Sequence, residues 1–250
     1  DTQVSLLIGF AFSIFYISMA IPIARLVDRG NRVNIISLGV FFWSLMTAVC
    51  GLAKNYWQLF LARVGVGVGE ATLTPAVYSL IPDYFPKEKL GTAVGFYMLG
   101  MSFGTGFALV LGGAILSYVS NIGDIVFPIV GTLRPWQVTF VIVGLPGIFL
   151  ALLIKLSIKE PVRRNIFDND SSSIDKTSLI SFLDNNKKTL SLITLAYSFG
   201  GMVFYGFLTW IPEHLRRAFD WDISNAGYVF GLMLAIFGSF GAVLGGKFHD

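Results

Sequence analysis

The sequence is poor in charged residues, in cysteine and in histidine. Only 13% of its 250 residues are charged, whereas soluble domains average about 25%. The single cysteine, Cys50, cannot form an internal disulfide, and the two histidines, His214 and His249, lie far apart in the sequence. The net charge of +3 is too small to indicate nucleic-acid binding. We therefore expect no metal site, no cofactor and no nucleic-acid partner.

Hydrophobic residues make up 54% of the chain, and the mean hydropathy is +0.71. The apolar runs are continuous rather than alternating, which favours membrane-spanning helices over a barrel. The sequence thus predicts an all-α polytopic membrane protein. Seven spans are expected, at Leu6–Ala24, Ile35–Leu52, Tyr56–Ile81, Leu90–Val119, Val138–Leu156, Leu190–Trp210 and Ala226–Leu244.

Basic residues in the loops predict the orientation of these spans. If the loop after the first span is inside, only four basic residues fall on the outside, namely Lys54, Arg134, Arg216 and Arg217. All other basic residues except Arg63 then lie inside. Cytoplasmic loops of membrane proteins carry an excess of Lys and Arg, so this assignment is strongly favoured.

One stretch of the third span, Leu59–Ala71, contains two ionisable residues and a glycine at every second position between them. Arg63 and Glu70 are seven residues apart, which is ~10.5 Å along one face of a helix and too far for direct pairing. Ionisable groups at membrane depth persist where they face a protein interior or a wet cavity, so the stretch predicts a polar pathway. Small residues also allow close helix packing, which we expect at Gly65, Gly67 and Gly69.

The first span ends in a charged turn with the sequence ARLVDRGNR, residues 24–32. Asp28 lies near a helix C-terminus, where the helix dipole disfavours an anion. We therefore expect the N-terminus of a neighbouring helix, or an adjacent arginine, to hold it; the alternative is a solvated turn. A similar pattern, Gly246–Asp250, follows the last span, and six spans separate the two aspartates, Asp28 and Asp250. This repeat indicates parallel six-span halves.

The fourth span is rich in glycine, and glycine-rich helix faces allow close packing. We expect this role for Gly95, Gly104, Gly112 and Gly113. The segment GMSFG at residues 100–104 also matches the serine-hydrolase pattern G-x-S-x-G. That pattern needs a preceding strand and a nearby histidine, and the sequence offers neither, so we do not expect a catalytic serine there.

A polar stretch rich in Ser, Asp and Asn divides the chain. We expect residues 1–164 to form one helical half that lacks its first helix, 165–188 a flexible cytoplasmic linker, and 189–250 the start of a second half. Within the linker, residues 177–183 could form a short helix on the membrane surface.

Several of these segments resemble motifs of the major facilitator superfamily, and within it the bacterial spinster-like group. The turn at residues 24–32 is similar to the pattern G-x-L-a-D-r-x-G-r, with Ala24 and Asn31 in place of glycines. Arg63–Gly69 resembles R-x-x-x-G-x-G, and Gly69–Ala71 resembles its spinster-like ending. The glycines of the fourth span match an antiporter motif, although Ala108 and Leu109 replace its Gly-Pro. Further similar segments are Arg134–Gln137, Gly144–Gly147 and Lys159–Pro161.

The resemblance implies that the seven spans are helices two to eight of a twelve-helix fold, so that helix one and helices nine to twelve are absent from this sequence. It implies secondary active transport by rocking of two halves about a midplane site. In this group a helix-four arginine and glutamate, here Arg63 and Glu70, carry proton coupling. The implied solutes are small organic or lipid-like molecules, since animal members export lysolipids and sphingoid phosphates.

From the residue pattern and from the family resemblance together we assign expected roles. Glu70 would bind the coupled proton, because burial favours the neutral form of a carboxyl group, and Arg63 would hold an anionic group of the solute. Asp28, Arg29, Arg32 and Asp250 would form a conformational latch on the inside. We expect a multi-pass protein of the bacterial inner membrane, surrounded by lipids and monomeric at full length. Two alternatives remain open: a non-transporting receptor or scaffold of the same fold, and a membrane-embedded lipid enzyme.

Overall fold

The computed structural model describes residues 3, 6–128, 131–163 and 176–249. Within these residues, seven helical segments are long and apolar enough to cross a membrane. They are Ala11–Arg29, Arg32–Cys50, Tyr56–Tyr84, Lys87–Ile122, Pro135–Ser157, Ser181–Phe219 and Ser224–Gly245. The prediction of a helical, polytopic membrane protein with seven spans is confirmed.

The helices follow one another with short connections. In chain order the elements are η1 (Leu6–Phe10), α2 (Ala11–Arg29), α3 (Arg32–Cys50), α4 (Tyr56–Glu70), α5 (Leu73–Tyr84), η2 (Lys87–Lys89), α6 (Leu90–Ile122), β1 (Ile125–Phe127), β2 (Gly131–Leu133), α7 (Pro135–Ser157), α8 (Lys176–Phe219), α9 (Ile223–Met233), η3 (Leu234–Gly238) and α10 (Ser239–His249). The elements η1 and η3 are single π-helical turns that continue into α2 and α10.

The turn after the first span forms where the sequence predicts it. α2 ends at Arg29, and Gly30 takes an extended conformation. The side chain of Asn31 then accepts a hydrogen bond of 2.8 Å from the backbone N–H of Asn34 and so caps α3. The first span thus continues past its predicted end at Ala24, because the charged residues of its last turn remain helical.

The third span is interrupted, although the sequence analysis treats it as continuous. α4 ends at Glu70, and the hydroxyl of Thr72 donates to the carbonyl of Gly69 at 2.8 Å. Pro75, in the first turn of α5, has no N–H with which to continue the helical hydrogen bonds. The break therefore leaves Glu70 at a helix end inside the membrane span.

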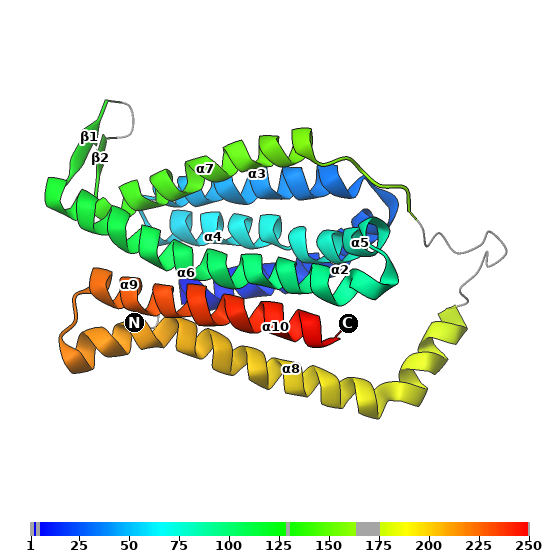
Figure 1. Ribbon diagram of the computed structural model, residues 1–250. Helices are drawn as coiled ribbons and strands as arrows, with labels where there is room; N and C mark the ends of the chain where they lie inside the picture. The colour runs from blue at the N-terminus through cyan, green and yellow to red at the C-terminus, as the bar shows by residue number, and fades with distance from the viewer. Residues whose placement is uncertain (1–2, 4–5, 129–130, 164–175, 250) are drawn as a thin grey trace.

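The outer loop between α6 and α7 contains a β-hairpin that the sequence analysis does not predict. Ile125, Val126 and Phe127 pair antiparallel with Leu133, Thr132 and Gly131. Gly123, which ends α6, and Gly131, which begins β2, both have positive φ, a conformation that favours glycine. In Figure 1 the hairpin stands at the end of the bundle where α7 begins.

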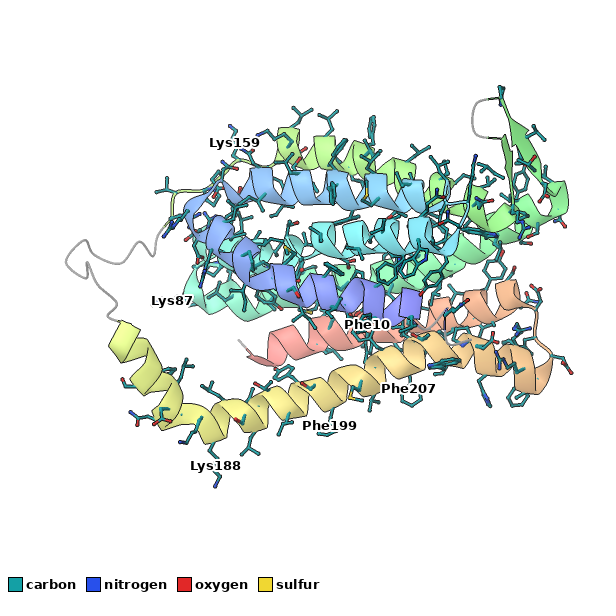
Figure 2. All side chains as sticks on the ribbon, turned by 180° about the vertical axis from the view of Figure 1, so that it is seen from behind. Phe10, Lys87, Lys159, Lys188, Phe199 and Phe207 are labelled. Carbon is teal, nitrogen blue, oxygen red and sulfur yellow. The ribbon has the colours of Figure 1, made fainter. Side chains whose placement is uncertain are left out.

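The helices form layers that run from α3 and α7 on one flank to α8 on the other (Figure 1). α3 packs most extensively against α7 and then against α4, while α6 packs against α9, η3 and α10. α8 contacts chiefly α9 and exposes large apolar side chains. Phe199 and Phe207 of α8 point away from the bundle in Figure 2, as expected for side chains that face lipid.

The core of the first half is built from small and branched apolar residues. One buried cluster joins α2, α3, α5 and α7 through Val27, Ile36, Val40, Ala76 and Ala151. A second buried cluster joins α3 and α4, and half-buried Phe12 of α2 packs against it. These two clusters hold α2, α3, α4, α5 and α7 together as one packed unit beside α6.

The predicted linker, residues 165–188, overlaps the start of α8. Residues 164–175 lie outside the described part of the chain, whereas Lys176 begins a helix that continues to Phe219. The short helix predicted at residues 177–183 is therefore the first part of a longer one, which bends near Lys188 in Figure 2. Lys87, Lys159 and Lys188, all predicted to be inside, lie toward the end of the molecule opposite the hairpin (Figure 2).

Candidate functional site

Glu70 is the last residue of α4, and its side chain is exposed. Among the described residues, no side chain or backbone group forms a hydrogen bond or an ion pair with its carboxylate. The helix break after Glu70 places this exposed side chain at a helix end. An ionisable group inside a membrane span with no fixed partner is available to a proton, a solute or water.

Arg63 lies two turns earlier on α4 and does not form an ion pair with Glu70. Its guanidinium group lies over the ring of Phe12 of α2, 5.8 Å from the ring centroid, in a cation–π contact. Phe12 in turn stacks on Tyr16 at 5.6 Å between centroids. Arg63 and Glu70 thus lie on the same helix without a direct ion pair, as their spacing predicts.

Tyrosines of two neighbouring helices contact α5, the helix that follows Glu70, and they are not among the predicted site residues. The hydroxyl of Tyr16 of α2 lies 3.3 Å from that of Thr74, in the first turn of α5. The ring of Tyr97 of α6 packs edge to face on the ring of Tyr78 of α5, with 5.8 Å between the centroids. Hydroxyl groups in the middle of apolar spans are the signal that could have revealed them.

The three glycines of α4 allow close approach of helices on two sides. A methyl group added at Gly69 would lie 2.8 Å from the backbone nitrogen of Trp43, and one at Gly65 would lie 2.6 Å from the side chain of Met46, both on α3. A methyl group at Gly67 would lie 2.7 Å from the carbonyl oxygen of Phe12 on α2. The alternation arises because residues two apart face nearly opposite sides of a helix.

The glycines of α6 differ from those of α4 in how closely they are packed. A methyl group added at Gly104 or Gly112 would meet no described atom within 4 Å, and Gly113 makes only an ordinary contact with Ser224. Among the described residues no helix covers this side of α6 at Gly104 and Gly112, so the close packing expected there remains a prediction. Gly95 is buried.

The glycine of α6 that does pack closely is Gly106. A methyl group added there would clash with the carbonyl oxygen of Gly231 and would lie 2.6 Å from the backbone nitrogen of Ala235. Gly231 of α9 has the reciprocal contact with the carbonyl of Gly106, at 2.6 Å. A pair of glycines thus brings α6 and α9 together, on the opposite side of α6 from the one that Gly104 occupies.

Arg32 is the centre of a charged cluster at the end of the bundle that is predicted to face the inside, called the inner end below. Its side chain is 1% exposed and forms ion pairs with Asp83, at the end of α5, and with Glu160, after α7, the latter at 2.6 Å. It also donates to the carbonyl oxygens of Ser79, at 2.8 Å, and Pro161, at 3.2 Å. The predicted latch residue Arg32 therefore joins three segments of the first half instead of pairing with Asp28.

The other predicted latch residues are exposed or lie outside the description. Asp28 and Arg29 are exposed, and no ion pair joins either one to another described residue. Instead, Arg163 donates to the backbone carbonyls of Val27, Asp28 and Gly30, two of these bonds being 2.6 and 2.7 Å long. Asp250 lies outside the described residues. The turn thus has the solvated character that the sequence analysis gives as the alternative, and the latch remains a prediction.

The whole sequence matches one protein family. The family described as "Major Facilitator Superfamily" matches residues 1–250. The chain belongs to the major facilitator superfamily. Within the described residues, no group of three or more His, Cys, Asp or Glu side chains could hold a metal ion.

Solved and curated proteins are similar to this chain in fold or in sequence. A bacterial homologue of the human lysosomal transporter Spinster, in an inward-facing and unoccupied conformation, is 36% identical with a TM-score of 0.77, over 96% of this chain and 53% of that one. The "Probable L-galactonate transporter" of Escherichia coli (strain K12) is 26% identical over 100% of this chain and 53% of its own length. The "Sphingosine-1-phosphate transporter SPNS2" of Danio rerio is 26% identical over 91% and 45%.

These matches confirm the spinster-like resemblance and the partial superfamily fold. The chain spans about half the length of the curated relatives that it matches. The relatives of this superfamily member are named as transporters rather than as enzymes.

Proposed function

We propose that this chain forms part of a secondary active transporter that couples solute movement to protons by alternating access. The observation that carries the proposal is Glu70, an ionisable side chain inside a membrane span, exposed at a helix end and without a fixed partner among the described residues. Placing an ionisable group inside a membrane span costs free energy, so the groups that are found there usually have a function. The membership in a transporter superfamily supports the same conclusion.

Proton coupling requires a group that changes its protonation state as the pathway opens to each side. Glu70 can do this because no described residue forms a salt bridge that would hold it permanently ionised. The guanidinium group of Arg63, on the same helix, lies over the ring of Phe12 of α2 and not on Glu70. The hydroxyls of Tyr16 and Thr74, 3.3 Å apart, add polar groups at the start of α5, just after Glu70.

The solute is proposed to be a small organic or lipid-like molecule that carries an anionic group. Arg63 supplies the positive charge for that group, and the aromatic rings of Phe12 and Tyr16 supply apolar surface next to it. The names of two relatives, which refer to a sugar acid and to a sphingoid phosphate, both describe anions. The protein is proposed to lie in the inner membrane of a bacterium, with the Lys87 and Lys159 end in the cytoplasm.

The test uses the protein that contains this chain, purified and reconstituted in liposomes, with uptake measured with and without an imposed pH gradient. Glu70→Gln keeps the size of the side chain but removes the charge that cycles. We expect solute binding and exchange to survive while gradient-driven accumulation is lost. Glu88→Gln is the matched control, because Glu88 is an exposed carboxylate in the inner loop. The control is expected to accumulate solute as the unmodified protein does.

Arg63→Ala separates the role of the cation from that of the carboxylate. It leaves Glu70 able to take up a proton, so solute affinity or the pH optimum should change while coupling remains. If Glu70→Gln still accumulates solute in proportion to the gradient, the coupling assignment is wrong and Glu70 is a polar packing residue.

A further inference from the structure

A cavity of about 400 Å³ opens on the outer face, away from the Glu70 site. It lies between the loop after α3, strand β2 of the hairpin and the first turn of α7. Its lining consists of Ala53, Lys54, Gly131, Thr132, Arg134, Trp136 and Gln137. The lining contains two cationic side chains and no carboxylate. In Figure 1, α3 and α7 form the flank of the bundle opposite α8, so this cavity is not part of the proposed pathway.

The two cations stand out against the general charge pattern of the outer face. Only four basic residues are predicted to lie on that face. Arg216 and Arg217 both pair with Glu213, the first at 2.7 Å. Lys54 and Arg134 have no ion pair with any described residue. The two outer cations that are free to bind an anion thus line the same cavity, although they are far apart in the sequence.

One buried side chain fixes the backbone of both cationic residues. The amide group of Gln137 donates to the carbonyl oxygen of Ala53, next to Lys54, at 3.0 Å, and it accepts from the backbone N–H of Arg134 at 3.0 Å. The hairpin is also anchored, because Leu133 is buried in a cluster with Val119 and Val138. The cavity is therefore held in shape by packed residues, and the side chains of Lys54 and Arg134 are exposed at it.

We propose that this outer cavity binds an oxyanion, a phosphate or carboxylate group, through Lys54 and Arg134. Arginine presents a fork of N–H donors that matches such a group, and lysine adds a compact positive charge. The hydroxyl of Thr132 and the indole of Trp136 line the same cavity and can contact the remainder of the ligand. The N-terminus of α7, which begins at Pro135, adds its positive dipole end.

The anionic group has two possible sources, the head group of an anionic lipid in the outer leaflet and a free anion in the external medium. Both present the same chemistry to Lys54 and Arg134. The site is independent of proton coupling, so its failure would leave the proposed transport function untouched, and loss of coupling in Glu70→Gln would leave this site intact.

The experiment measures binding to the detergent-purified protein by isothermal titration calorimetry. The probes are inorganic phosphate, dihexanoyl phosphatidylglycerol and, as a zwitterionic reference, dihexanoyl phosphatidylcholine. The double variant Lys54→Gln/Arg134→Gln removes both cations from the cavity. The matched control, Arg216→Gln/Arg217→Gln, removes the same charge from the same face outside the cavity. Lys54→Arg/Arg134→Lys keeps the charge, and retained binding in this variant shows that substitution at these positions does not unfold the cavity.

We expect saturable binding of at least one anionic probe, weakened at least tenfold in the cavity double variant and unchanged in the control. Binding of phosphate identifies a free anion as a sufficient ligand, whereas binding of phosphatidylglycerol alone identifies a lipid head group. The proposal is overturned if neither anionic probe binds, if phosphatidylcholine binds as tightly as phosphatidylglycerol, or if both double variants lose affinity equally.

Discussion

The inner end of the bundle and the Glu70 site both hold charged side chains, but they differ in how those charges are paired. At the inner end, Arg32 has two carboxylate partners and two carbonyl partners, and Arg163 has three carbonyl partners. In the Glu70 site, the carboxylate has no partner among the described residues, and Arg63 contacts an aromatic ring.

This difference indicates two distinct uses of charge in one protein. A side chain with several fixed partners cannot change its protonation or its contacts without a large cost in free energy, so the Arg32 cluster holds α3, α5 and the end of α7 as one body. A side chain without fixed partners can exchange a proton or a ligand at small cost. Alternating access needs both properties, a half that moves as a unit and a site that can change state.

The comparison is tested most directly by removing Arg32. Arg32→Ala removes the cation that pairs with buried Asp83 and with Glu160, and loss of one partner from a buried ion pair costs about 3–5 kcal/mol. We expect the largest loss of stability of any substitution considered, measured as the change in the free energy of unfolding of the purified protein in detergent. Arg29→Ala, at an exposed position with no ion pair among the described residues, is the matched control and should change stability by less than about 0.5 kcal/mol. Equal effects of the two substitutions would show that the inner cluster does not fix the helices.

A second comparison concerns the glycines of α4 and α6. Gly69→Ala places a methyl group 2.8 Å from the backbone of Trp43, and overpacking of this kind costs about 1–3 kcal/mol. Gly104→Ala meets no described atom within 4 Å, and alanine favours a helix over glycine by about 0.5–1 kcal/mol. We therefore expect Gly69→Ala to lower the unfolding temperature and Gly104→Ala to raise it, when both are measured in the same detergent. If both variants are destabilised, then another part of the protein covers Gly104.

The sequence predicts the spans well because each span is a local property. Apolar runs and the turn at Gly30 and Asn31 involve neighbours in the chain. The predicted spans agree with the structure to within five residues, except the sixth, whose helix extends nine residues further at each end. The break after Glu70 could also have been predicted, because Pro75 has no N–H to donate to the backbone carbonyl of Ala71. The hairpin could not have been predicted, because strands of three residues are too short for their alternation of apolar and polar residues to differ from that of an irregular loop.

The partners of the charged residues could not be predicted in the same way. Arg32 meets Asp83 and Glu160, which are 51 and 128 residues away in the sequence. Which helices become neighbours decides these pairs, and hydropathy and motif spacing along the chain do not show it. The same limit applies to the packing expected at Gly104 and Gly112. A pattern of glycines shows that one helix face has no large side chains, but it does not show which helix covers that face. The separation of Arg63 and Glu70 could be predicted because both residues belong to one helix, whose geometry sets the distance between them.

The smallest expected effect is that of Asp28→Asn. In this structure the Asp28 carboxylate is exposed at the C-terminus of α2, where the dipole disfavours an anion, and Arg163 binds the backbone carbonyl rather than the side chain. If Asp28 acts as a latch, its stabilising partner is met in another conformation, so loss of the charge should shift the equilibrium by about 0.3–2 kcal/mol. We expect a severalfold change in the inward to outward ratio with solute affinity preserved. The ratio can be measured from the labelling rates of single cysteines placed at the two ends of α2 in a background without native cysteines, in which Cys50, the one cysteine of this sequence, is replaced by alanine. Asp184→Asn, which removes an exposed charge from α8, serves as the control. Unchanged labelling at both ends in Asp28→Asn would show that the turn is solvated and has no latch role.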